Sequence, residues 1–184
     1  MIAFFIGSFN PPTKAHLEIC LKLKNEFQKI ILVPVNSRNK ELISFKHRYQ
    51  MLSIYERQYD FLKIDCIMNN YSYFDYRLLD ILKDKYHDNN IIIGSDLLKK
   101  IKDFDNYEYL LDNYVFHIVT RDNDDVLKIV NEYYCKYQHH IKIYSMVSVV
   151  SSTKARNFIK NNQNLENILD QEIISYIRNN HLYF

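Results

Sequence analysis

The sequence predicts an α/β fold in which helices cover both faces of an open parallel sheet. Short apolar runs alternate along the chain with segments of helical periodicity, which is typical of βαβ units. The apolar runs contain few polar residues, as expected of strands that are buried on both faces. Gly7 and Gly94, the only two glycines, each follow such a run. Because glycine allows a close approach to the backbone, they indicate one ligand crevice where two strands end.

Each expected element is located by these patterns. Strands are expected at residues 2–6, 29–35, 62–67, 90–93, 114–119 and 141–144. Helices are expected between them at residues 13–27, 45–57, 75–86, 96–101 and 125–137. After the last strand, Ser151-Ser152-Thr153 is a helix N-cap signal, and apolar spacing from Leu169 to Ile177 indicates a second helix. A small C-terminal helical part should therefore complete the fold.

Length and composition predict one domain over residues 1–184. A chain of 184 residues with 47% hydrophobic content can bury one sizeable core. The formal net charge of +2 argues against nucleic acid or a membrane surface as the main partner. Without a basic leader or an apolar stretch of membrane-spanning length, the protein is expected to be cytoplasmic. The three cysteines lack metal-ligand or redox spacing, so we expect packing thiols.

The segment after the first strand, GSFNPPTKAH at residues 7–16, predicts a phosphate site. It is interpreted as a strand end, a turn stiffened by two prolines, and a helix with His16 in its first turn. A helix N-terminus offers unpaired N–H groups and a partial positive charge. A lone histidine in this position is more often a packing or capping residue, but the preceding turn favours a ligand-facing His16.

A second anion site is expected at residues 151–156, SSTKAR. Backbone N–H groups and hydroxyls at a helix start bind anions, and Arg156, one turn further on, can add bidentate contacts to phosphate oxygens. Taken alone, this hexapeptide is better explained as a plain helix cap.

Together, GSFNPPTKAH, IIIGSD at residues 91–96 and SSTKAR resemble the nicotinamide/nicotinate mononucleotide adenylyltransferases, nucleotidyltransferases with an (H/T)xGH signature. The resemblance spans the chain and implies a Rossmann-like sheet and an enzyme of NAD biosynthesis. Such an enzyme joins ATP to nicotinate or nicotinamide mononucleotide by direct in-line attack and releases pyrophosphate. The resemblance further implies Mg²⁺ bound through the ATP phosphates, with no protein ligand assigned to the metal. Homo-oligomers are common in the family, and the sequence leaves the oligomeric state open.

The resemblance also assigns roles to individual residues. Catalytic roles are assigned to Thr13, His16 and Arg156. ATP-binding roles are assigned to Gly7, Ser8, Phe9, His16, Gly94, Asp96, Ser152, Thr153 and Arg156. Substrate-binding roles are assigned to Ser8, Lys40, Arg48, Tyr73, Phe74, Phe104 and Tyr107.

Some positions depart from the family pattern. Phe104 stands where a tryptophan often stacks on the pyridine ring, Ala15 replaces the glycine of the signature, and Phe74 replaces a threonine. The choice between nicotinate and nicotinamide therefore stays open. Alternatives are a phosphopantetheine adenylyltransferase, another nucleotidyltransferase, or a nucleotide-binding protein without turnover. The GSD segment and the aromatic residues Phe104 and Tyr107 favour a pyridine acceptor.

Overall fold

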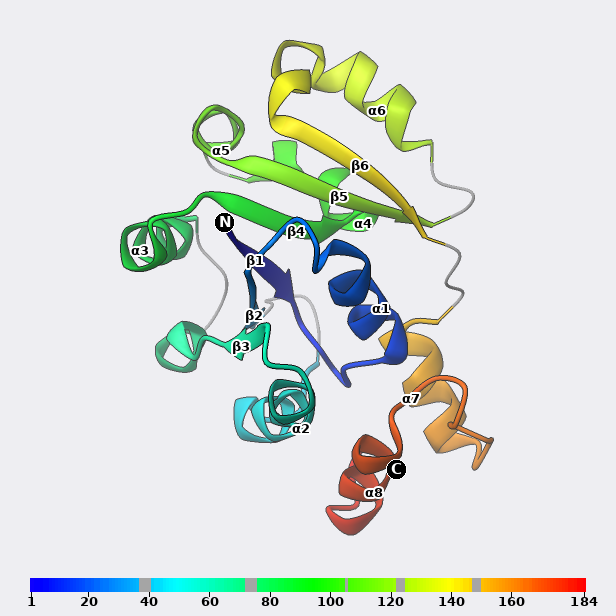
Figure 1. Cartoon of the computed structure of the whole chain (residues 1–184). Helices are drawn as coiled ribbons and strands as arrows, with labels where there is room; N and C mark the ends of the chain where they lie inside the picture. The colour runs from blue at the N-terminus through cyan, green and yellow to red at the C-terminus, as the bar shows by residue number, and fades with distance from the viewer. Residues whose placement is uncertain (37–40, 72–75, 105, 122–124, 147–149) are drawn as a thin grey trace.

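The computed structural model describes residues 1–36, 41–71, 76–104, 106–121, 125–146 and 150–184, and within them six strands form one parallel sheet (Figure 1). The strand order is β3-β2-β1-β4-β5-β6. The strands are β1 (Ile2–Gly7), β2 (Lys29–Pro34), β3 (Leu62–Ile64), β4 (Asn90–Gly94), β5 (Val115–Arg121) and β6 (Ile141–Met146). Every neighbouring pair is parallel, which confirms the expected open parallel sheet.

Helices cover both faces of this sheet because its strands are apolar on both sides. In β1, Ala3 and Phe5 belong to one buried cluster, and Phe4 and Ile6 belong to another. The first cluster is completed by α1 (Lys14–Leu23), α2 (Phe45–Gln58), α7 (Ser152–Lys160) and α8 (Gln171–Asn179). The second is completed by α3 (Arg77–Tyr86), α4 (Ser95–Leu98), α5 (Tyr107–Asn113) and α6 (Val126–Tyr133).

The expected C-terminal helical part is present as α7 and α8, which lie beside α1 and α2 in Figure 1. Ile173, Ile174 and Ile177 of α8 are buried in the cluster shared with α1 and α2. Each fully buried isoleucine stabilises this packing by roughly 1.5–3 kcal/mol. The segment is therefore part of the core on that face of the sheet.

The strand order reverses at β1, which lies between β2 and β4. Phe5 of β1 pairs with Ile92 of β4, so Gly7 and Gly94, each two residues further on, end their strands at the same level of the sheet. This is the point at which open parallel sheets bind ligands. The two glycines therefore end neighbouring strands at the same edge of the sheet.

Two expected elements end early for identifiable reasons. Strand β3 stops at Ile64 instead of residue 67 because the Asp65 carboxylate accepts the Ile67 N–H at 2.8 Å and starts the 3₁₀ turn Ile67–Asn70. Helix α6 stops at Tyr133 instead of residue 137, and the Tyr134 hydroxyl donates to the Leu98 carbonyl oxygen at 3.0 Å. The chain then continues as the 3₁₀ helix Cys135–His140.

Other boundaries also differ. Helix α1 ends at Leu23 and not at residue 27, and the predicted helix at 96–101 is divided into α4 and the 3₁₀ helix Ile101–Asp103. Helix α5 was not predicted, because it is short and begins after Asn106, a non-glycine residue with φ of 59°.

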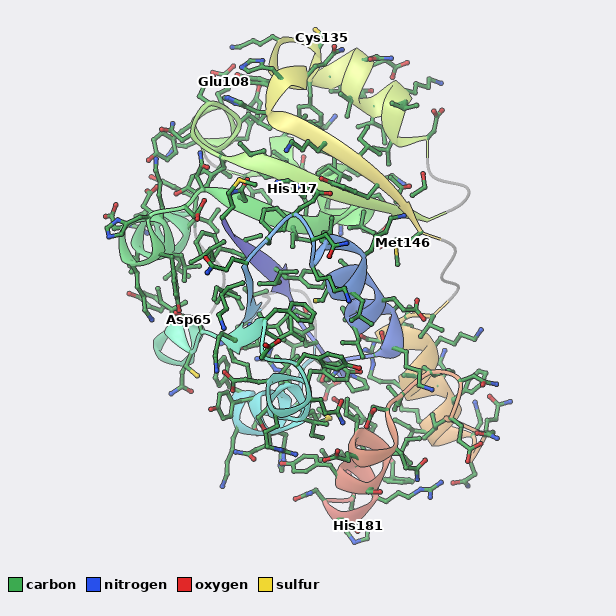
Figure 2. All side chains as sticks on the ribbon, viewed as in Figure 1. Asp65, Glu108, His117, Cys135, Met146 and His181 are labelled. Carbon is green, nitrogen blue, oxygen red and sulfur yellow. The ribbon has the colours of Figure 1, made fainter. Side chains whose placement is uncertain are left out.

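The prediction of packing thiols is right for one cysteine and wrong for two. Cys20 is buried, whereas Cys66 and Cys135 are exposed, and all three are free (Figure 2 labels Cys135). In the described parts of the chain, no helix is long and apolar enough to cross a membrane.

Candidate active site

A cavity of about 410 Å³ lies where the sequence predicts the crevice. Its walls come from the turn after β1, the start of α1, the ends of β5 and β6, and the start of α7. Met146, labelled in Figure 2, lines it from the end of β6. The cavity brings together eight of the predicted site residues: Ser8, Phe9, Thr13, His16, Asp96, Ser152, Thr153 and Arg156.

His16 is fixed by the residue that caps its helix. The backbone N–H of Thr13 donates to His16 Nδ1 at 2.9 Å, and the Thr13 hydroxyl lies 2.8 Å from the same nitrogen. An Nδ1 that accepts a hydrogen bond carries no proton, so the neutral ring carries its proton on Nε2. His16 is thus both a capping residue and a residue of the cavity wall.

The start of α7 is fastened to the turn after β1. The Ser152 hydroxyl donates to the Pro11 carbonyl oxygen at 2.8 Å, and Arg156 Nη1 donates to the Asn10 carbonyl oxygen at 2.7 Å. Ser151 caps the helix by accepting the Lys154 N–H at 3.1 Å, as the N-cap signal predicts. Helices α1 and α7 therefore both begin at this cavity, and their partial positive charges favour an anion there.

Protein packing explains one of the two glycines and not the other. A Cβ on Gly7 would lie 3.0 Å from the ring of Phe9, so this glycine makes room for a neighbouring side chain. Phe9 itself is buried with φ of 46°, a left-handed conformation that costs a bulky residue of order 1–3 kcal/mol. A Cβ on Gly94 would meet nothing within 4 Å. Protein packing does not require glycine at 94, which is consistent with the close approach of a ligand there.

Comparison with known proteins shows which family the chain belongs to. Residues 4–158 match the cytidylyltransferase-like family. Over 193 aligned residues the chain is 33% identical to a protein of Acholeplasma laidlawii named "Probable nicotinate-nucleotide adenylyltransferase", covering 100% of this chain and 97% of the relative. The chain belongs to the nicotinate-nucleotide adenylyltransferase family. A relative of the same name from Flavobacterium johnsoniae is 27% identical, with 99% and 98% coverage.

Solved structures in the nicotinate-nucleotide adenylyltransferase family share the fold. The nicotinic acid mononucleotide adenylyltransferase of Plasmodium falciparum, complexed with NaAD, has a TM-score of 0.81 at 24% identity, covering 99% of this chain and 96% of that chain. A "Putative Nicotinate-nucleotide Adenylyltransferase" from Vibrio parahaemolyticus has a TM-score of 0.73 at 18% identity, with 99% and 94% coverage. Both likenesses confirm the predicted Rossmann-like sheet.

Asn10 lines the cavity, although the sequence analysis assigned it no role. Its side chain is buried and lines the cavity. Its Nδ2 donates to the Glu41 carbonyl oxygen at 3.4 Å, and its Oδ1 accepts from the Ile43 N–H at 3.4 Å and the Tyr183 hydroxyl at 2.9 Å. These partners are distant in sequence, so the only local signal was a polar residue between Phe9 and two prolines.

Arg48 is not brought to the cavity. It is 1% exposed, and its guanidinium donates to the carbonyl oxygens of Ser8 at 2.9 Å, Val35 at 2.9 Å and Ile43 at 3.3 Å. It also donates to Asn36 Oδ1. Burial lowers the pKa of the guanidinium. Arg48 thus supports the turn after β1 and does not line the cavity.

The aromatic residues expected to bind the pyridine ring are also outside the cavity wall. Phe104 and Tyr107 are half-buried against the cluster on the opposite face of the sheet, near α4 and α5. Lys40, Tyr73 and Phe74 lie outside the residues that the structure describes. Ala15, which replaces the glycine of the family signature, lines the cavity.

Proposed function

We propose that this chain transfers the adenylyl group of ATP to nicotinate mononucleotide and releases pyrophosphate. The carrying observation is one cavity that is lined by His16 and by the beginnings of α1 and α7. Full-length similarity to a relative named as a nicotinate-nucleotide adenylyltransferase supports this acceptor. The protein is accordingly an enzyme of NAD biosynthesis.

The reaction is a direct in-line displacement. An oxygen of the acceptor's 5′-phosphate forms a bond to the α-phosphorus of ATP, and the bond from that phosphorus to the β-bridging oxygen breaks. A lone pair of the attacking oxygen forms the new bond, and the electron pair of the broken bond leaves with the bridging oxygen, so the products are a dinucleotide and pyrophosphate. Because phosphate is already a competent nucleophile, catalysis depends on alignment and on stabilisation of developing charge.

Different residues of the cavity align the phosphates and stabilise the developing charge. Thr13 holds His16 Nδ1, so that Nε2–H is directed to the phosphate oxygens on which charge develops. Ser152, Thr153 and Arg156 bind the β- and γ-phosphates at the start of α7. In addition, the turn that contains Gly7, Ser8 and Phe9 provides backbone contacts to the nucleotides, and Gly94 and Asp96 contact ribose.

Mg²⁺ suits this cavity as the companion of ATP. Asp96 and Glu41 are among the residues that line it, and carboxylate oxygens are ligands that Mg²⁺ accepts alongside phosphate oxygens and water. No cluster of three metal-binding side chains occurs in the described ranges. We infer that the metal is held mainly by the phosphates, because Mg²⁺ keeps several waters and binds readily to phosphate oxygens, and there it would neutralise negative charge.

For the acceptor, we infer that the pyridine ring binds beyond Gly94, toward Phe104 and Tyr107. A phenyl ring can stack on a pyridine in place of an indole. Tyr73 and Phe74 are assigned to the pyridine substituent, and Lys40 to the mononucleotide phosphate. Arg48 contributes indirectly, because its hydrogen bond to the Ser8 carbonyl oxygen fixes the turn after β1.

The test is pyrophosphate release from Mg-ATP with nicotinate mononucleotide, nicotinamide mononucleotide and phosphopantetheine in parallel. We expect turnover with nicotinate mononucleotide and formation of the corresponding dinucleotide. Turnover with phosphopantetheine alone would transfer the assignment to that acceptor. ATP binding without turnover on any acceptor would refute the proposed enzyme.

A further inference from the structure

The segment that follows α8 contacts a residue of the cavity wall. Two residues in left-handed conformation, His181 with φ of 50° and Tyr183 with φ of 69°, turn the chain back toward the core. Leu182 between them is buried, and its N–H donates to the Ile177 carbonyl oxygen at 3.0 Å. Left-handed non-glycine residues carry a conformational cost, so this path must be stabilised by the contacts that it makes.

Tyr183 makes the contact that reaches the cavity wall. Its hydroxyl lies 2.9 Å from Asn10 Oδ1. The orientation of this amide is fixed, because Oδ1 also receives the Ile43 N–H and Nδ2 faces the Glu41 carbonyl oxygen. The Tyr183 hydroxyl must therefore be the donor.

Asn10 connects Tyr183 to the phosphate-binding end of the cavity. The Asn10 carbonyl oxygen accepts from Arg156 Nη1 at 2.7 Å, and the next carbonyl oxygen, that of Pro11, accepts from Ser152 at 2.8 Å. Arg156 and Ser152 both line the cavity. A shift of the Asn10 side chain would thus move the turn on which both residues are anchored.

We propose that Tyr183 is a positioning residue for ATP, which through its hydrogen bond to Asn10 fixes the turn that anchors Arg156 and Ser152. Burial raises the pKa of Tyr183, so the hydroxyl keeps its proton and remains a donor at neutral pH. The role of Arg156 and Ser152 toward ATP phosphates rests on the proposed function. The link between Tyr183 and the anion site does not depend on the acceptor.

Tyr183→Phe removes only the hydroxyl. We expect the KM for ATP, and the Kd for Mg-ATP measured by calorimetry without acceptor, to rise about fivefold, the factor expected for loss of one neutral hydrogen bond. The KM for nicotinate mononucleotide should not change. A merely structural role would instead lower the stability of the protein, or raise the KM for both substrates by the same factor. Either result, without a selective rise in the KM and Kd for ATP, would overturn the proposal.

Tyr176→Phe is the matched control. Its hydroxyl, on the same C-terminal part, bonds to His47 Nδ1 at 2.9 Å, and neither residue lines the cavity. This variant should retain the ATP affinity of the parent protein.

Asn10→Ala supplies a second test through Asn10 itself. If Tyr183 acts through Asn10, adding Tyr183→Phe to Asn10→Ala should not weaken Mg-ATP binding further. Additive effects would refute the route. If the parent protein binds Mg-ATP but transfers an adenylyl group to no acceptor, the proposed function is refuted. The role of Tyr183 would still be tested, because it depends only on the Kd for Mg-ATP of the parent protein and its variants.

Discussion

At the scale of residues, the contact between Thr13 and His16 decides which nitrogen of the imidazole ring carries a proton. A histidine near a phosphate could be a cation, an acceptor or a neutral donor, and these forms differ in the protons on their ring nitrogens. The N–H of Thr13, 2.9 Å from Nδ1, selects the neutral form with the proton on Nε2. Packing against the rings of Phe5 and Phe9 holds the plane of the imidazole. A neutral donor is suited to a site where charge develops during the reaction.

We predict that His16→Ala lowers kcat by about 100-fold, as is typical when one donor to developing charge is removed. Because the lost interaction strengthens in the transition state, the KM for ATP should change less than kcat. Steady-state kinetics and the circular dichroism spectrum of the purified variant would check this. Undiminished turnover in a folded variant would exclude the assigned role of His16.

At the scale of elements, α7 acts as one wall of the cavity. Its N-cap, Ser151, and its two anchors to the turn after β1, Ser152 and Arg156, all lie within its first turns. The helix therefore delivers its N–H groups, its hydroxyls and a guanidinium to the cavity as a unit. Loss of the cap should disturb these cavity residues together, because they share one helix start.

We predict that Ser151→Ala costs about 1 kcal/mol of stability, the usual value of an N-cap, and lowers Tm by roughly 2–4 °C. It should also weaken Mg-ATP binding. Asp170→Ala removes the comparable cap of α8, where Asp170 accepts the Glu172 N–H at 2.8 Å. Thermal melts and ATP titrations of both variants separate the effects: an equal loss of ATP affinity in both would contradict a local role for the α7 cap.

At the scale of the whole molecule, the sheet carries a buried polar group that makes stability depend on pH. His117 of β5, labelled in Figure 2, is 1% exposed, with Nε2 3.1 Å from Asn90 Oδ1 and Nδ1 3.0 Å from the Tyr144 hydroxyl. Burial and, secondarily, the charge of Lys142 lower its pKa to about 4, whereas Glu26 acts in the opposite direction. Folding therefore favours the neutral imidazole.

As the pH falls from 6.5 toward 4, unfolded molecules take up a proton on His117 before folded ones do, so stability decreases across this window. The full difference corresponds to about 3 kcal/mol of unfolding free energy. Denaturant titrations between pH 7 and pH 4 would measure it. His117→Gln, which cannot titrate, should show a shallower decline, and identical slopes for both proteins would contradict the assignment.

Sequence by itself determined the parts of this protein that depend on local pattern. Apolar runs located all six strands, and the central strands β1, β2 and β4 carry a continuous hydrophobic signature because they are buried on both faces. The caps of α1 and α7 are encoded within a few residues. Segments 7–16 and 151–156 were likewise found locally, and the cavity unites them.

Tertiary structure alone decided the roles that depend on distant contacts. Arg48 was expected to contact substrate, yet four oxygens supplied by Ser8, Val35, Asn36 and Ile43 hold it in the interior. Asn10 and Tyr183 were given no role, and their hydrogen bond joins residues 173 positions apart. Periodicity reports which residues are buried, but a buried polar group is explained by its partners, and only the folded chain brings those partners together.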